Sequence, residues 1–548
     1  MAVKPGLIAA TLAAGVVACS QAPEPAPAAA VPGATPTDAA RAAVATATAA
    51  PAPRDPGVAW HKGDVDAAFA RAKADRRPVF LYWGAVWCPP CNQVKATIFN
   101  RQDFIDRSRR FIPVYIDGDS PGAQRQGARF KVSGYPTMIL FDPDGREITR
   151  LPGEVDADQY MRVLALGMGG ARPVKETLTA ALAAAAHKDT RTLAPEDWRM
   201  LAYYSWITDD GELLPRERVA PTLARLAQAC PAEPRETALR LALQAVAAAA
   251  TGKDAKPRNA PAATLVVRQV TADPALTRAN FDLLTYFAGK IAANVTLAKS
   301  AERAELVTAW DGALDRLVAD GGLWSADRLV ALAARVDLAK LDAGTAPLPA
   351  ALQQRVRDEV ARADRETTDV YARQAVIGTA AQLLADAGMM DASDALLTAE
   401  LTRSHSPYYY MLGLAANAKT RGDKATALEW HAKAWTTAVG AATRLQWGAS
   451  YVNALVELAP QDSARIETVT ARVIGELEPT PDTFYDRNRR ALERIGKNLA
   501  AWNKGGNHSA ALRRLSAQMG GVCAKLPAGD PARAACAGVL SPRPPAAA

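Results

Sequence analysis

A short apolar segment that runs into two closely spaced cysteines constrains the fold of this chain more than any other feature. Residues 78–83 carry the aliphatic and aromatic side chains of a buried strand. A loop that ends at Trp87 follows, and then Cys88-Pro89-Pro90-Cys91 opens a segment, 88–99, with the apolar spacing of a helix. The order strand, loop and helix places Cys88 at a helix N-terminus.

This position gives the two cysteines different expected roles. Unpaired N–H groups and the helix dipole favour a negative charge at a helix N-terminus, and the thiolate is the nucleophile in disulfide exchange. Cys91 lies about one turn later, so its sulfur can reach that of Cys88. We therefore expect Cys88 to attack a substrate disulfide and Cys91 to resolve the mixed disulfide.

The two prolines between the cysteines affect the same thiolate. Pro89 and Pro90 have no N–H group, so the loop offers the Cys88 sulfur fewer hydrogen-bond donors. A less stabilised thiolate favours the reducing direction of exchange. The prolines should also stiffen the loop.

The elements around the cysteines predict an α/β domain over 57–170. Helices and strands alternate, and the turn signal Asp142-Pro143-Asp144-Gly145 joins the last two strands into a hairpin. The expected elements are helix 64–75, strand 78–83, helix 88–99, helix 102–109, strand 111–116, helix 124–130, strand 137–141, strand 146–151 and helix 156–166.

Two marks of this segment resemble the thioredoxin family, in its periplasmic thiol:disulfide interchange type. One is Trp87-Cys88-Pro89-Pro90-Cys91 after a strand, and the other is Gly134-Tyr135-Pro136-Thr137 just before the next strand. The resemblance implies a thioredoxin fold with no cofactor beyond the Cys88–Cys91 disulfide. It implies a cis peptide bond at Pro136, which faces the cysteines, and substrates that lie extended beside Tyr135. X-Pro bonds are the ones that adopt the cis form.

One position departs from the family. Many members carry a buried Asp six residues before the first cysteine, where it helps move the proton of the second; here Tyr82 stands there. Glu154 and Asp117 are the candidate replacements.

Zinc binding is the alternative use of such cysteines, but it needs two further ligands, and His61 is the nearest histidine or cysteine. We expect no metal site. A purely structural Cys88–Cys91 disulfide is disfavoured because so short a loop gains little stability.

The N-terminal segment is expected to direct export. Lys4 precedes an apolar stretch, 6–18, that is too short to span a bilayer. Its end, Val16-Val17-Ala18-Cys19, resembles the lipobox of bacterial lipoproteins. The resemblance implies a signal peptide over 1–18, acyl chains on Cys19 as the only membrane attachment, and the outer membrane as destination, because Ser20 follows. An ordinary signal peptide with a chance cysteine is the alternative.

Residues 19–56, rich in Pro and Ala, predict a disordered tether.

Residues 173–540 predict a large all-α region. They are rich in Ala and Leu, with few strand signals, and they are long enough for two subdomains. Near 370–440, two helix–turn–helix units place Gly388 and Gly422 34 positions apart, which resembles divergent tetratricopeptide repeats. A plain helical bundle is the alternative. Residues 541–548 predict a disordered tail, and the aromatics 408–410 predict helix packing.

The remaining cysteines divide into a pair and a single residue. Cys523 and Cys536 flank a turn-rich stretch, and in an oxidising compartment we expect a structural disulfide between them. Cys230 is left as a buried free thiol at a helix end.

The whole sequence favours a membrane-anchored thiol–disulfide oxidoreductase in the bacterial envelope. Its partners would be the thiols and disulfides of exported proteins and a membrane thiol-relay electron donor. The alternative is an envelope scaffold lipoprotein that binds a protein partner through its helical region. Nucleic-acid binding is disfavoured, since the net charge of +8 comes from scattered Arg and Lys among Asp and Glu.

Overall fold

The computed structural model describes residues 57–61, 64–132, 134–151, 153, 157–187, 193–206, 209, 211–253, 255–344 and 346–540. The segments expected to be a signal peptide, a tether and a C-terminal tail (1–18, 19–56 and 541–548), with Cys19, and also Glu154, lie outside the described residues. Within the described ranges, no helix combines the length and the apolar character needed to cross a bilayer.

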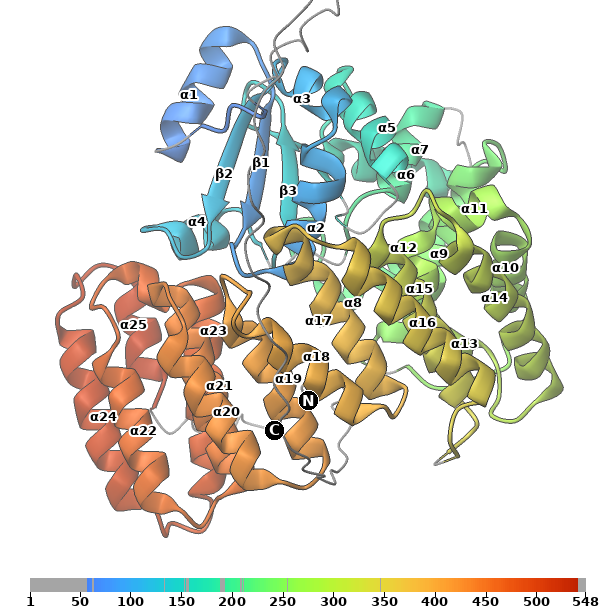
Figure 1. Ribbon diagram of the computed structural model, residues 1–548. Helices are drawn as coiled ribbons and strands as arrows, with labels where there is room; N and C mark the ends of the chain where they lie inside the picture. Colours follow the sequence, from blue (N-terminus) through green and yellow to red (C-terminus); the bar gives the residue numbers. More distant parts are fainter. Residues whose placement is uncertain are drawn as a thin grey trace, which may run out of the picture.

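The first part of the chain is a four-stranded sheet between two layers of helices (Figure 1). The strands lie in the order β2-β1-β3-β4, with β1 parallel to β2 and antiparallel to β3, and with β3 antiparallel to β4. The element order predicted from the sequence is confirmed. The elements are α1 (Val65–Asp75), β1 (Val79–Gly84), α2 (Pro89–Val94), the π-helix η1 (Lys95–Phe99), α3 (Gln102–Ser108), β2 (Ile112–Asp117), α4 (Ala123–Arg129), β3 (Thr137–Phe141), β4 (Glu147–Leu151) and α5 (Ala157–Met168).

The predicted hairpin turn forms through local hydrogen bonds. One carboxylate oxygen of Asp142 accepts the backbone N–H groups of Asp144 and Arg146, at 3.0 and 2.9 Å. Gly145 takes φ +83°, a left-handed conformation that glycine adopts without strain. This turn sets the register of β3 against β4.

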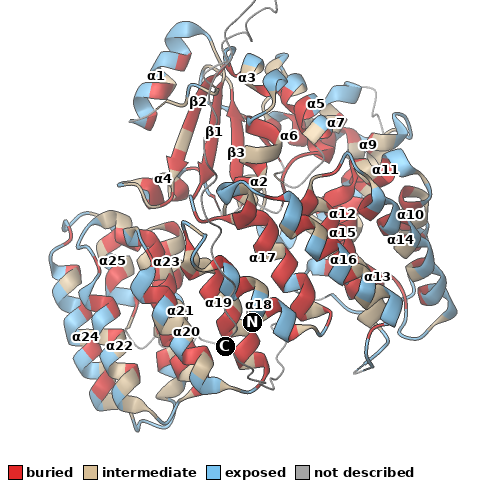
Figure 2. Cartoon of the chain, viewed as in Figure 1, coloured by how far each residue is buried: buried red, intermediate tan, exposed pale blue. Residues whose placement is uncertain are grey.

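The sheet is buried on both faces, and its two faces enter different cores (Figure 2). Val79, Leu81 and Trp83 of β1 belong to a small core beneath α1 and α4. Phe80 and Tyr82, on the opposite face, belong to a large core that runs under α2, η1 and α5 and on into the helical region. Packing is therefore continuous across the expected domain boundary near residue 170.

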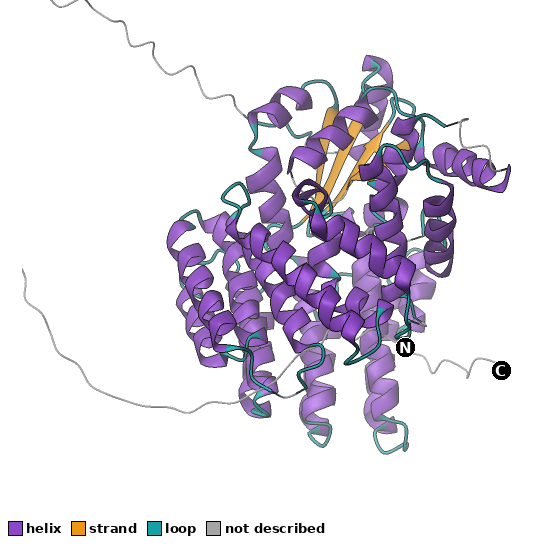
Figure 3. Ribbon diagram, turned by 90° about the vertical axis from the view of Figure 1, so that its right-hand side faces the viewer, coloured by secondary structure: helices purple, strands orange, loops and turns teal. Residues whose placement is uncertain are grey.

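The rest of the described chain is helical, and it curves beneath the sheet domain until its last third lies against α4 (Figures 1 and 3). Its elements are α6 (Val174–His187), α7 (Pro195–Ala202), α8 (Arg216–Ala229), α9 (Arg235–Thr251), α10 (Pro261–Ala272), α11 (Pro274–Ala279), α12 (Phe281–Tyr286), α13 (Ala288–Val295), α14 (Ala301–Ala319), α15 (Ser325–Lys340), α16 (Ala350–Glu366), α17 (Val370–Asp386), α18 (Met390–Glu400), α19 (Pro407–Thr420), α20 (Lys424–Thr437), α21 (Ala441–Leu458), α22 (Ser463–Gly475), the 3₁₀ helix η3 (Pro481–Phe484), α23 (Asp486–Trp502), α24 (Ser509–Ala524) and α25 (Pro531–Gly538).

Two helical hairpins, α17–α18 and α19–α20, contain the glycines that suggested a repeat. Gly388 and Gly422 end the first helix of each hairpin with φ of +82° and +76°. The same backbone turn thus recurs after 34 residues. The likeness to tetratricopeptide repeats stays a prediction.

A buried ion pair ties successive helices of the region together. The guanidinium of Arg240 on α9 is fully buried and donates to Asp282 at 2.8 Å and to the Ala202 and Ala279 carbonyls at 3.0 Å each. It therefore joins α7, α9 and the α11–α12 turn.

We predict that Arg240→Ala strongly destabilises the helical region, because it leaves the Asp282 carboxylate buried without its cation. Loss of one partner of a buried pair costs about 3–5 kcal/mol. Thermal unfolding followed by circular dichroism measures the change. The matched control is Arg268→Ala, which breaks an exposed pair with Glu305 and should cost at most about 1 kcal/mol. Equal losses of stability in the two variants would contradict the prediction.

Candidate redox site

The Cys88–Cys91 pair lies where β1 passes into α2. Cys88 is the N-cap of α2, and its Sγ accepts the backbone N–H of Cys91 at 3.2 Å. The two sulfurs are bonded, with the Cα atoms 5.2 Å apart. Pro89 and Pro90 occupy the first two helical positions, where the missing N–H groups cost the helix nothing. The first N–H that the loop can offer to the Cys88 sulfur is therefore that of Cys91.

The loop before β3 supplies the second part of the site. The Tyr135–Pro136 peptide bond is cis. The Tyr135 ring lies 6.0 Å from the ring of Trp87, and its hydroxyl accepts from Gln124 Nε2 at 3.4 Å. Trp87 directly precedes Cys88, so the structure brings the cis proline loop and the cysteine loop together.

Tyr82 stands where many members of the thioredoxin family carry a buried Asp. Its ring stacks on Tyr115 with the centroids 5.0 Å apart, and its hydroxyl is buried and has no hydrogen-bond partner among the described residues. Burial raises the pKa of Tyr82, and nearby Asp117 raises it further. The phenol is therefore neutral at physiological pH, and it cannot replace a carboxylate as a proton acceptor.

Asp117 lies near Tyr82, and Lys95 lies over the neighbouring Tyr115 ring. Asp117 ends β2 and accepts from the Tyr115 hydroxyl at 3.2 Å and from the Asp119 N–H at 3.0 Å. Lys95 follows Cys91 by four residues along the same helical stretch, with its Nζ 5.5 Å from the centre of the Tyr115 ring. Burial lowers the pKa of Lys95, and Asp117 opposes this shift. Of the two acids expected to replace the family's Asp in proton transfer, Glu154 and Asp117, the described structure contains Asp117.

The redox pair is covered by helices from the second part of the chain. Exposed fractions are 2% for Cys88, 0% for Cys91 and 8% for Trp87. The Trp87 indole donates to Thr443 Oγ1 at 2.7 Å, and the Trp87 carbonyl accepts from Gln374 at 3.2 Å. These contacts come from α21 and α17. The sequence reasoning missed them.

Aromatic packing and a cation complete this cover. The ring of Trp447 lies 4.9 Å from that of Trp87, and the ring of Tyr409 lies 6.2 Å away. The Arg487 guanidinium lies 4.3 Å above the Tyr135 ring and 5.4 Å from the Trp87 ring. Of the aromatics 408–410, which were expected to pack helices, Tyr409 thus also reaches the redox loop. The surface beside Tyr135, where a substrate was expected to lie, is occupied.

The other cysteines lie away from this site. Cys523 on α24 and Cys536 on α25 are bonded, with an S–S distance of 1.90 Å. Cys230 is a free, half-buried thiol at the C-terminal end of α8. Burial raises the pKa of Cys230 to about 11, so it is protonated at neutral pH. Among the described residues, no three His, Cys, Asp or Glu side chains gather in the arrangement of a metal site.

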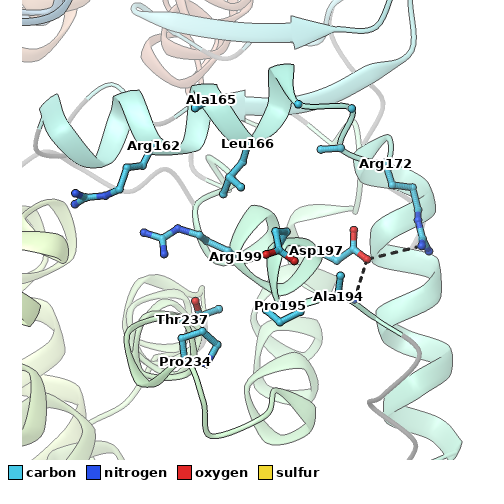
Figure 4. Close-up of a pocket in the computed structure, with 14 residues that line it drawn as sticks. Arg162, Ala165, Leu166, Arg172, Ala194, Pro195, Asp197, Arg199, Pro234 and Thr237 are labelled. Atoms are coloured by element: carbon cyan, nitrogen blue, oxygen red, sulfur yellow. Dashed lines mark hydrogen bonds and ion pairs between the residues drawn. The ribbon is translucent and has the colours of Figure 1, made fainter.

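A separate cavity of about 770 Å³ lies between α5, α7 and the start of α9 (Figure 4). Arg162, Arg172 and Arg199 line it together with Glu196 and Asp197, and Arg172 pairs with Asp197. No cysteine lines this cavity.

Comparison with known proteins agrees with the fold and the cysteine pair. The sequence profile of the family "Thioredoxin-like domain" matches residues 65–167. The chain is 31% identical over 102 residues to "Thiol:disulfide interchange protein DsbD 2" of Pseudomonas aeruginosa, which is 18% of this chain and 17% of that protein. It is 28% identical over 103 residues to the DsbD protein of Pseudomonas fluorescens, 18% of each chain.

Two further relatives are shorter proteins. "Disulfide bond reductase DsbH" of Chlamydia pneumoniae is 25% identical over 99 residues, which cover 15% of this chain and 57% of that protein. A solved structure of a DsbH oxidoreductase, 21% identical, covers 20% of this chain and 85% of its own, with a TM-score of 0.19. The chain thus spans under a fifth of the length of the DsbD proteins. Residues 65–167 are a thioredoxin-like domain with a C-x-x-C pair, related to DsbD and DsbH, followed by a large helical region.

We predict that Tyr82→Phe leaves the rate of disulfide exchange within about twofold of the wild type, because the hydroxyl that it removes has no partner and stays protonated. Stopped-flow reduction of a fluorescent peptide disulfide measures this rate. The comparison variant is Asp117→Asn, which removes the described candidate acid and should slow the step in which Cys91 resolves the mixed disulfide. A large loss of rate in Tyr82→Phe alone would place the proton path through the phenol instead.

Proposed function

We propose that this chain is a lipid-anchored thiol–disulfide oxidoreductase of the bacterial envelope, which reduces or isomerises disulfides in exported proteins. The observation that carries the proposal is the Cys88 sulfur at the N-cap of α2, held by the Cys91 N–H and set beside the cis proline loop. The relation to proteins named for thiol:disulfide interchange and disulfide reduction supports it.

The reaction balances in two exchange steps. The Cys88 thiolate attacks one sulfur of a substrate disulfide; that S–S bond breaks, and the leaving thiolate takes a proton. Cys91, as its thiolate, then attacks the Cys88 sulfur and releases the second substrate thiol. Two electrons pass to the substrate, and the Cys88–Cys91 disulfide seen in the structure is formed. A membrane thiol-relay donor would return the pair to the dithiol.

The local structure favours reduction over oxidation. A strong oxidant needs a highly stabilised thiolate, and here Pro89 and Pro90 withhold two backbone donors, so that the N–H of Cys91 is the one that bonds to the Cys88 sulfur. Anchoring through Cys19 and an outer-membrane location remain part of the proposal, and they rest on the lipobox resemblance at residues 16–19.

A scaffold lipoprotein is the second candidate function. The observation that favours it is the extent of the helical region, whose hairpins α17–α18 and α19–α20 carry the same glycine turn, as stacked repeats that bind protein partners do. In that case the thioredoxin-like domain would be auxiliary.

We predict that the full-length protein reduces insulin disulfides with dithiothreitol as electron donor, and that Cys88→Ser abolishes this activity. Turbidity of the released insulin chain measures the rate. Cys230→Ser is the matched control, because that thiol lies apart from the redox pair and should be dispensable. Wild-type activity no higher than that of Cys88→Ser would favour the scaffold function.

We also predict that Cys91→Ser traps exported proteins as mixed disulfides with Cys88, because the resolving thiol is gone. Non-reducing electrophoresis and mass spectrometry identify the trapped proteins, with the Cys88→Ser, Cys91→Ser double variant as control.

The redox potential of the wild-type pair should be clearly more negative than about −120 mV, the value of a strong periplasmic oxidant. A potential at or above that value would contradict the reducing direction.

A further inference from the structure

Three elements near the end of the chain form a cover over the redox face. We call α21 (Ala441–Leu458), η3 (Pro481–Phe484) and α23 (Asp486–Trp502) together the covering arm. Thr443 of the arm binds the indole of Trp87, and Arg487 lies over the Tyr135 ring. Asp482 of the arm accepts the backbone N–H of Arg125 at 2.9 Å. The arm therefore contacts the cysteine loop, the cis proline loop and the start of α4 together.

The arm is fastened by a helix cap that comes from the thioredoxin-like domain. Helix α21 has no side-chain cap of its own, since Gly440 precedes it. The Asp119 carboxylate supplies the cap, and it accepts the Thr443 N–H at 2.7 Å and the Thr443 hydroxyl at 2.5 Å. Gly440 takes φ +94°, and a Cβ there would lie 2.5 Å from Asp119. The close approach of the two parts thus depends on this glycine.

A protein disulfide cannot reach Cys88 in the closed structure, where α17 packs against α2 and the arm lies over Trp87 and Tyr135. Exchange requires a substrate sulfur in contact with Cys88 Sγ, and this residue is 2% exposed. The arm makes polar contacts to Trp87, Asp119 and the backbone of Arg125, and a bound polypeptide or water can replace each of them. Its apolar contact at this face is the Trp447 ring on the Trp87 ring, which an apolar side chain of the polypeptide can replace.

Exposed apolar side chains flank the cover on its α17 side. Val86, two residues before Cys88, is 41% exposed, and Tyr371 at the start of α17 is 53% exposed. His405 joins them, since its ring lies 4.6 Å from that of Tyr371 and its Nε2 is 3.3 Å from the Val86 carbonyl. This patch remains available to a partner when the arm is closed.

We infer that the covering arm occupies the surface on which a disulfide-bearing polypeptide has to dock, and that such a polypeptide reaches Cys88 by displacing the arm from Trp87 and Tyr135. The inference rests on the proposed function and names its partner as an unfolded or flexible protein segment that carries a disulfide. Val86 and Tyr371 provide its first contact. A folded protein whose binding free energy is too small to displace the arm does not reach Cys88, so the arm discriminates against such proteins.

The size dependence of Cys88 alkylation tests the inference in the full-length protein. In a Cys230→Ser background, the reduced protein is treated with N-ethylmaleimide or with a maleimide carrying a polyethylene glycol chain of about 5 kDa, and mass spectrometry measures modification at Cys88. The ratio of the two rates is compared with that of an unstructured cysteine peptide. We expect Cys88 to disfavour the large reagent by at least about tenfold relative to the peptide, which corresponds to about 1.4 kcal/mol.

A double variant, Thr443→Val with Arg487→Ala, should release the arm and bring the ratio back toward that of the peptide. The matched control is Thr436→Val with Arg489→Ala, because these exposed side chains contact only their own helices. A wild-type ratio equal to that of the peptide would overturn the inference, as would an equal change in both double variants. Alkylation needs no exchange partner, so a protein that fails to reduce insulin but keeps the size dependence would refute the proposed function alone.

Discussion

Trp87 contacts both the thioredoxin-like domain and the helical region, through its side chain and its main-chain carbonyl. The arrangement of the redox site depends on this residue. Its indole donates to Thr443, its carbonyl accepts from Gln374, and its ring packs against Tyr135 and Trp447. A buried indole N–H needs a partner, because an unpaired one costs about 1–3 kcal/mol. This single residue therefore couples the position of the cysteine loop to the position of α17 and α21.

The chemistry of the pair follows from what surrounds it in this interface. The prolines leave the Cys91 N–H as the near donor to the Cys88 sulfur, and the burial of Cys88 disfavours a charge at the same atom. Both effects raise the energy of a buried Cys88 thiolate. Displacing the cover would return water to the sulfur and so favour the reactive form at the moment when a partner is present.

The sequence predicted the local features of the site because they depend on short segments. The strand before Cys88 and the proline-rich helix start follow from spacing and from the backbone limits of proline, whereas the cis bond at Pro136 was implied by the resemblance to the thioredoxin family. The fold that they indicate is the one observed. Proline is a less certain guide in the helical region, where α8 begins at Arg216 and carries Pro221 inside the helix at the expense of one main-chain hydrogen bond.

Contacts between distant segments could not be predicted in this way. The Thr443 hydroxyl has no special neighbours in sequence, and Asp119 lies in an ordinary turn after a strand. Thr443 and Asp119 come into contact because of the path that the whole helical array between them follows. A composition rich in Ala and Leu indicates that the helices pack closely, but it does not determine the path of the array.

The separation of 356 positions along the chain from Trp87 to Thr443 has a consequence for how the protein is made. A chain that emerges N-terminus first presents the cysteine loop and the cis proline loop long before α21 exists to cover them. Formation of such distant contacts is slow, because the intervening chain must first be ordered. The nascent chain would thus pass through a period with an uncovered redox pair, and its own later cysteines, Cys523 and Cys536, emerge only after α21.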